Sequence, residues 1–218
     1  MRALPALALL TGSLVWSLVW YPYRALRDAG FDGLLSTTLT YSIAFTLALL
    51  VWRPKPGWPA RPWLLLALAL AAGGCNIGYV LATLAGEVVR VLLLFFLAPL
   101  WTVLLARILL GERLNRFGAF AILLSLAGAS TMLWQPVAGL PLPRDVADWL
   151  GLGAGFCFAL FNVLSRRARG LPVSQRILVS FFGVAASGAL LAMLFGVAAP
   201  PAPATVPVGL LLLPLLIG

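Results

Sequence analysis

The stretch GEVVRVLLLFFLAPLWTVLLARILLGERLNRFGAFAILLSLAGASTMLW, residues 86–134, decides the fold. It contains two largely apolar runs, 88–106 and 117–134, separated by a short segment in which most of its charged residues lie. A bilayer core about 30 Å thick needs roughly 20 apolar residues of α-helix to cross it, and each run has about that length. The stretch therefore predicts two transmembrane helices joined by a short turn.

The rest of the chain has the same character. Of its 218 residues, 62% are hydrophobic and 10% are charged, which is not the composition of a soluble domain. The apolar runs predict seven complete spans at 4–22, 33–52, 63–83, 88–106, 117–134, 149–165 and 177–197, with part of an eighth that begins near 207. We therefore expect an all-α, polytopic membrane protein.

The basic residues alternate between successive connections, which indicates membrane topology and not a nucleic-acid partner. If the N-terminus is cytoplasmic, the inner segments hold most of the arginines and the only lysine. The outer segments then hold Arg24, Arg27, Arg90 and Arg144 with five of the six acidic residues. The positive-inside rule therefore predicts a cytoplasmic N-terminus. The large excess of Arg over Lys, with abundant Ala, Leu and Gly, favours a bacterial inner (plasma) membrane.

An internal repeat organises the predicted spans. An offset of 143 residues carries the span starts at 4, 33 and 63 onto 147, 176 and 206. Because five spans precede the second copy, that copy enters the membrane from the opposite face, so the repeat is inverted. We predict a first repeat at 1–145 and a partial, inverted second repeat at 146–218. We interpret the end of the chain within LLLLPLLIG as a truncation that omits the last helices of a five-plus-five fold.

Residues 86–134 resemble the fourth and fifth helices of the drug/metabolite transporter superfamily, in its EamA-like branch. The shared pattern is an apolar helix with a central proline, Pro99, then LGER at 110–113, then a glycine-containing helix. The stretch TGSLVWSLVWYPYRAL, residues 11–26, is similar to the first helix of that family. The resemblance implies ten helices as five plus five inverted, both termini cytoplasmic, and a substrate cavity between the halves. It implies no particular substrate.

Glu87 and Arg90 are candidates for gating or substrate binding. Their i, i+3 spacing puts them on one face of a helix, where they can pair. In the predicted topology they lie near the outer boundary of the fourth span, at the mouth of a cavity. The alternative is an interfacial ion pair that anchors the helix end, because charges near helix ends snorkel at low cost.

Other candidates are aromatic or polar residues inside or at the ends of spans. They are Trp16, Trp20, Tyr23, Arg24, Asn76, Tyr79 and Asn162, with Thr38 and Tyr41 as further members. The alternative for the aromatic residues is anchoring at the membrane surface, and for Asn76 a bond to a neighbouring helix. Gly74 and Gly78, four residues apart, favour close helix packing. Pro99 permits a kink, which could be a hinge or simple packing.

The predicted function is a secondary transporter that exports small polar metabolites or drugs by alternating access. Its predicted partners are a small-molecule substrate and the lipid bilayer, without nucleic acid, cofactor or metal, and a homodimer stays open. The chain has no histidine, which excludes serine-histidine and H-E-x-x-H chemistry, so we do not expect an enzyme. The alternatives are an intramembrane lipid-modifying enzyme acting through Glu87 or Asp148, and an inactive truncated fragment.

Overall fold

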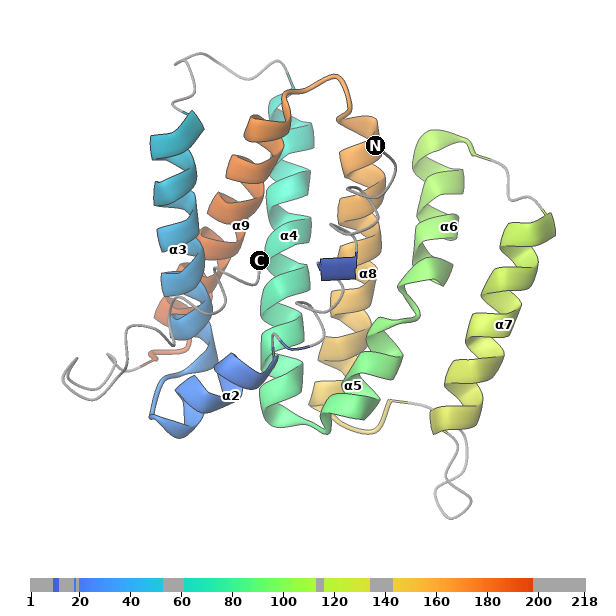
Figure 1. Ribbon diagram of the computed structural model, residues 1–218, viewed down its shortest axis with the longest axis horizontal. Helices are drawn as coiled ribbons and strands as arrows, with labels where there is room; N and C mark the ends of the chain where they lie inside the picture. Colours follow the sequence, from blue (N-terminus) through green and yellow to red (C-terminus); the bar gives the residue numbers. More distant parts are fainter. Residues whose placement is uncertain are drawn as a thin grey trace.

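The regular structure of the described chain is entirely α-helical (Figure 1). The computed structural model describes residues 10–11, 18, 20–52, 61–112, 116–133 and 143–197. Its helices are α2 (Trp20–Asp28), α3 (Gly33–Trp52), α4 (Pro62–Ala85), α5 (Val88–Phe95), α6 (Ala98–Leu110), α7 (Arg116–Leu133), α8 (Val146–Arg167) and α9 (Val173–Leu194). Most of the predicted first span and the partial eighth lie outside the described residues.

Five helical segments of the described chain are long and apolar enough to cross a membrane. They are α3, α4, α8, α9 and the pair α5–α6, taken together as Val88–Leu110. The helix α3 has the bounds that the sequence predicts, and α7 corresponds to the predicted span 117–134. The all-α, multi-pass membrane fold is therefore confirmed, whereas the number of spans and the inverted repeat stay predictions.

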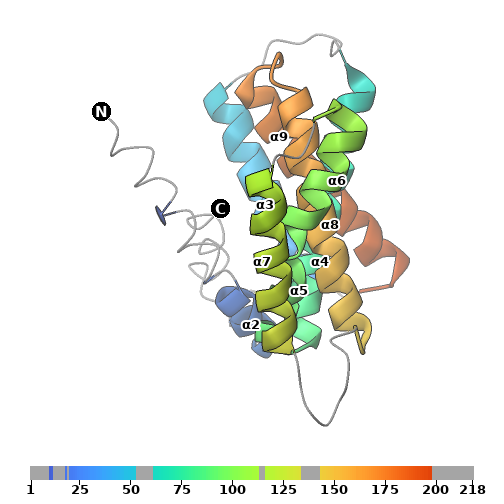
Figure 2. The same cartoon turned by 90° about the vertical axis from the view of Figure 1, so that its right-hand side faces the viewer.

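The helix α4 forms the centre of the described bundle and packs against both α8 and α9 (Figures 1 and 2). Small residues allow this approach. A Cβ added at Gly183 of α9 would lie 2.3 Å from the carbonyl oxygen of Ala69, so this crossing requires a glycine. On the α8 side of α4, Gly74 and Gly78 face Cys157 and Ala154. The predicted packing role of Gly74 and Gly78 is confirmed.

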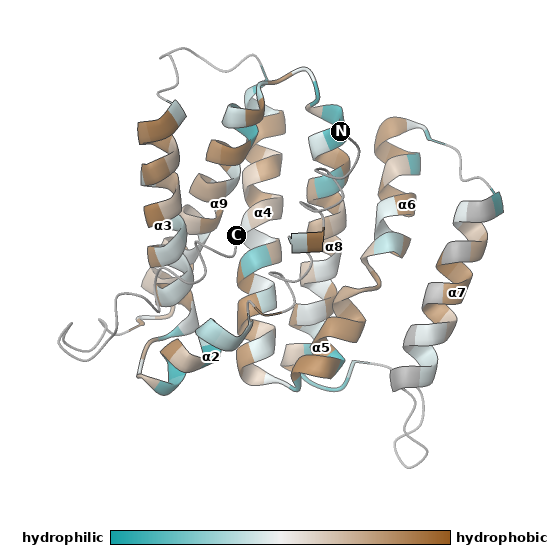
Figure 3. Ribbon diagram, viewed as in Figure 1, coloured by the Kyte–Doolittle hydropathy of each residue, from teal (hydrophilic) through white to brown (hydrophobic). Residues whose placement is uncertain are grey.

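Apolar side chains cover the outside of the helices, and charges gather at the two ends of the bundle (Figure 3). The lower end in Figure 1 contains the C-terminus of α4 and the N-termini of α3, α5 and α8. The upper end contains the C-termini of α6 and α8 and the N-terminus of α4. The arginines of the predicted outer connections all lie at the lower end. The predicted alternation of basic residues between successive connections therefore agrees with the directions in which the helices run. Which end faces the cytoplasm stays a prediction.

Candidate functional site

Arg90 of α5 and Asp148 of α8 form a buried ion pair at the lower end of the bundle. The Nε of Arg90 lies 2.6 Å from Oδ2 of Asp148, and the two side chains are 11% and 2% exposed. The same carboxylate oxygen accepts a hydrogen bond of 2.9 Å from the backbone N–H of Arg144. A close pair shielded from water is a strong electrostatic contact, and breaking such a pair by removing one partner is strongly destabilising.

The first turn of α8 holds Asp148 in place. Asp145 is the N-cap, and its carboxylate accepts a hydrogen bond of 2.9 Å from the backbone N–H of Asp148. A carboxylate in the first turn also interacts favourably with the positive end of the helix dipole. The sequence predicted a span at 149–165, with Asp148 just before it. The helix α8 begins at Val146, slightly before this approximate span, so Asp148 lies inside its first turn.

The ion pair that the structure gives Arg90 is with Asp148 and not with the expected Glu87. Glu87 is the N-cap of α5 and has φ −76° and ψ 117°, which is extended backbone. Glu87 therefore lies just before the first helical residue, and its side chain is exposed. Arg90 instead meets a carboxylate 58 residues away in sequence.

Arg24 and Arg27, predicted to lie in a connection, belong to α2 and cap the C-terminus of α4. Arg24 donates from Nε and Nη2 to the carbonyl oxygen of Thr83 at 3.2 and 3.0 Å, and from Nη2 to that of Gly86 at 3.0 Å. Arg27 donates to the carbonyl oxygen of Leu84. These carbonyls have no partner within the helix, and cations at this end are favoured by its dipole. The guanidinium of Arg24 also lies over Trp20, 5.6 Å from the ring centroid.

The other polar candidates lie between α2, α3, α4 and α8. Tyr41 of α3 donates a hydrogen bond to Oδ1 of Asn76, whose Nδ2 donates to its own helix at Ala72 O. The predicted bond of Asn76 to a neighbouring helix is therefore confirmed. Asn162 donates to the carbonyl oxygen of Phe158 within α8. Tyr23 is 3% exposed in α2, and burial raises its pKa to about 12, so its hydroxyl stays protonated.

Two aromatic contacts join α8 to the preceding helices. The ring of Phe95, at the end of α5, packs against Tyr79 with the ring centroids 5.5 Å apart, and against Phe158 at 5.4 Å. Trp101 of α6 meets Phe156 edge to face at 5.6 Å. These contacts place Tyr79 in an aromatic interface between helices. Trp16, by contrast, lies outside the described residues.

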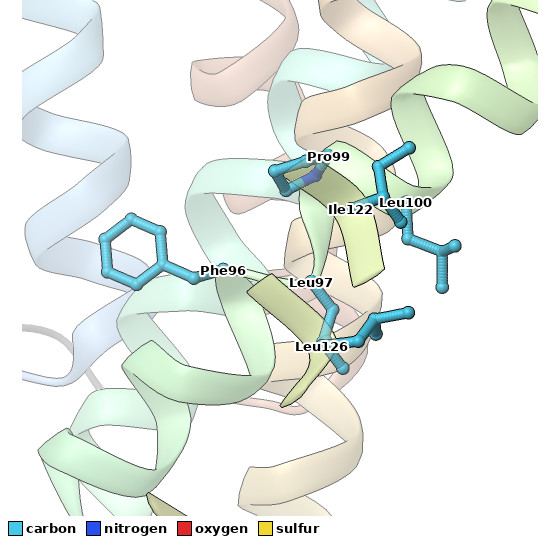
Figure 4. A pocket seen from close by; sticks show the side chains of 6 residues that line it. All are labelled: Phe96, Leu97, Pro99, Leu100, Ile122 and Leu126. Carbon is cyan, nitrogen blue, oxygen red and sulfur yellow. The ribbon is translucent and has the colours of Figure 1, made fainter. Parts of the chain in front are cut away.

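Pro99 marks a break between α5 and α6. The sequence predicted one helix with a kink there, whereas Phe96 and Leu97 form a turn between two helices. Pro99 has no N–H to donate to the carbonyl of Phe95, and a Cβ added at Gly155 of α8 would lie 2.6 Å from that oxygen. Beside the break is a small apolar pocket of about 10 Å³, lined by Phe96, Leu97, Pro99, Leu100, Ile122 and Leu126 (Figure 4). That volume suits roughly one water molecule and no larger solute.

Sequence reasoning missed Asp148 as the partner of Arg90. The available signal was the pair of aspartates at 145 and 148 just before an apolar run, a pattern typical of a helix N-terminus. Within the described ranges no three residues of the metal-ligating types cluster together. The groups that are present are hydroxyls, amides and paired charges, which suit hydrogen bonding to a polar solute.

Comparison with known proteins places these helices among membrane transporters. The EamA-like transporter family matches residues 3–134. Protein RarD of Salmonella typhi is 26% identical over 165 residues, which is 72% of this chain and 53% of that protein. An uncharacterized transporter of Pseudomonas aeruginosa is 25% identical over 166 residues, 73% of this chain and 53% of that protein.

The chain spans about half the length of these curated relatives. A shorter match joins it to the chloramphenicol-sensitive protein RarD of Pseudomonas aeruginosa, at 37% identity over 111 residues, 50% of this chain and 34% of that protein. No solved structure gives a significant match.

Proposed function

We propose, from the premise that this chain belongs to the EamA-like transporter family, that it is a secondary transporter exporting small polar metabolites by alternating access. The observation that carries the proposal is the ion pair between Arg90 and Asp148. It joins α5, inside the segment that the family matches, to α8, the first described helix after that segment. In our proposal these helices belong to the two inverted repeats, 1–145 and 146–218.

A second pair joins the same two parts at the upper end. Arg166, in the last turn of α8, lies 2.9 Å from the carboxylate of Glu112, just after α6. Alternating access by rocking requires the contacts at one end to part while those at the other end close. Both pairs are formed in the present conformation, and in our proposal the buried lower pair is the contact that parts during transport. We assign the lower end to the outside, on the charge distribution along the sequence.

The proposed substrate path lies between the repeats. In this proposal Arg90 and Asp148 close the outer mouth, with the exposed Glu87 beside it. Asn76, Tyr79 and Asn162 lie deeper, and the break at Pro99 is a hinge candidate. The remaining candidates, Trp16, Trp20, Tyr23 and Arg24, line or support the outer side. A lipid-modifying enzyme acting through Asp148 is not favoured, because this carboxylate is already engaged by Arg90 and the N–H of Arg144.

The test is flux from proteoliposomes that contain the full chain. The vesicles are loaded in turn with labelled amino acids, polyols, a cationic dye and chloramphenicol, the last because of the name of one relative. We expect efflux of at least one solute above the rate of protein-free vesicles. Asp148→Asn should change this rate, whereas Glu112→Gln should leave it close to that of the unmodified chain. No flux for any solute would count against the proposal.

A further inference from the structure

Two hydroxyl groups are buried in α3 without a hydrogen-bond partner. Ser36 and Thr40 are 1% and 2% exposed. Within the part of the chain that the structure describes, neither oxygen atom has a hydrogen bond of good geometry, although the hydroxyl of Tyr23 lies close to that of Thr40. A buried hydroxyl without a partner costs roughly 1–3 kcal/mol, so such groups usually have a reason to be present.

Other hydroxyls in these helices make a hydrogen bond that Ser36 and Thr40 do not make. A Ser or Thr within a helix can donate to the carbonyl four residues before it. This bond is made by Thr37, Thr38, Thr46, Thr83, Thr102 and Ser180, at distances between 2.7 and 3.0 Å. Ser36 and Thr40 do not make it. Their hydroxyls are therefore free to bond to something else.

The two hydroxyls belong to a larger group of uncharged polar side chains. Ser36 and Thr40 are four residues apart and lie on the same face of α3. Tyr23 of α2 lies beside Thr37 and Thr40, and Tyr41 bonds to Asn76 of α4. We name these six residues, Tyr23, Ser36, Thr37, Thr40, Tyr41 and Asn76, the hydroxyl cluster.

The electrostatics around the hydroxyl cluster disfavour a charged ligand. None of its members carries a charge, and the adjacent Arg24 is already bonded to the carbonyls of Thr83 and Gly86. A hydroxyl both donates and accepts, so its best match is a solute group that also does both.

We propose that the hydroxyl cluster binds an uncharged, hydroxyl- or amide-bearing solute, with Ser36 and Thr40 as its direct hydrogen-bond partners. This inference rests on the proposed transport function and names the class of substrate. The solute satisfies the two hydroxyls that the helix leaves unpaired. It reaches them when the lower end of the bundle opens.

The test is solute binding to the purified full chain in detergent, followed by the melting temperature. The neutral probes are mannitol and N-acetylglucosamine, and the charged probes are choline and succinate. A neutral probe is expected to raise the melting temperature, and the charged probes are not. The double variant Ser36→Ala with Thr40→Val should bind the neutral probe about tenfold more weakly or worse. The control is Thr46→Val, an exposed hydroxyl in the same helix that already bonds to Ser42.

A second readout separates binding from folding. Because the two hydroxyls are unpaired in the solute-free chain, their removal should leave the melting temperature without solute unchanged or raise it. The inference is overturned if no neutral probe shifts the melting temperature, if only charged probes do, or if the double variant responds like the unmodified chain. A solute-free melting temperature below that of Thr46→Val would also overturn it, because the hydroxyls would then serve the fold. Binding retained without any flux would instead contradict the transport proposal alone.

Discussion

The two ends of α8 are each tied to the α5–α6 segment by an ion pair, but the two pairs differ in burial. At the lower end Arg90 and Asp148 are 11% and 2% exposed. At the upper end Arg166 and Glu112 are 45% and 52% exposed. The two pairs also differ in which partner carries which charge. In the lower pair α8 supplies the acidic residue, at its N-terminus, and in the upper pair it supplies the basic residue, at its C-terminus. Both charges therefore suit the dipole of α8.

The helix backbones lie close together beside the lower pair. Near the lower pair, Gly151 and Gly155 let α8 lie directly against the backbone of Val91 and Phe95. In the middle of α8, Phe156 meets Trp101 of α6 edge to face, with the ring centroids 5.6 Å apart. The buried ion pair should therefore hold the lower end of α8 more strongly than the exposed ion pair holds the upper end. In a transporter that rocks, the firm end is the one that must be released.

The largest effect is expected from Asp148→Asn. This change removes the buried negative charge that Asp148 presents to Arg90, so we expect the free energy of unfolding to fall by about 3–5 kcal/mol. The measurement is unfolding by SDS in mixed micelles, followed by circular dichroism. Glu112→Gln is the matched control at the other end of α8. If both variants lose the same free energy of unfolding, the two ends of α8 do not differ in the strength of their ion pairs.

Gly155→Ala tests the close packing beside the buried pair. The added Cβ would meet the carbonyl oxygen of Phe95 at 2.6 Å, so we expect a loss of about 1–3 kcal/mol. Gly153→Ala in the same helix is the control, since a Cβ there meets nothing within 4 Å. The control should be neutral or should gain up to about 1 kcal/mol from helix propensity. If both variants behave alike in SDS unfolding, the lower half of α8 is not closely packed.

Pro99→Ala tests whether the proline causes the break between α5, which contacts the lower part of α8, and α6, which contacts its upper part. Pro99 lies at the start of α6, where a missing N–H costs little, so stability should change by about 1 kcal/mol or less. Alanine can donate to the carbonyl of Phe95, and we expect α5 and α6 to merge into one straighter helix. Distances between spin labels at Val88 and Leu110 should then lengthen. An unchanged distance would assign the break to packing against α8.

The smallest effect is expected from Arg166→Gln at the upper end. Exposed ion pairs contribute about 0–1 kcal/mol and are screened by salt. The loss should therefore lie below about 1 kcal/mol and disappear when unfolding is repeated in 1 M salt. A larger loss that resists salt would show that the upper end is as firm as the lower end.

The sequence predicts what depends on local pattern. The apolar run at 33–52 has the bounds of α3, and the small residues at 74 and 78 predict a close helix contact. The partner of Arg90 was not predictable, because a contact across 58 residues is set by how α5 and α8 pack. Arg24 was assigned to a connection for the same reason, since the carbonyls it caps belong to another helix. Ser36 and Thr40 gave no signal, because an unpaired hydroxyl looks like any other in sequence.

The central claim is that the lower end must part during transport, and a disulfide across it tests that claim directly. A Cβ added at Gly86 would lie 2.6 Å from that of Ala147, so cysteines there need only a small shift to reach the roughly 3.8 Å of a disulfide. The double variant Gly86→Cys with Ala147→Cys, with Cys75 and Cys157 replaced by alanine, keeps Arg90 and Asp148 intact. The account predicts that oxidation stops efflux from proteoliposomes and that a reductant restores it. Efflux at the full rate from the oxidised, fully cross-linked protein would contradict the account.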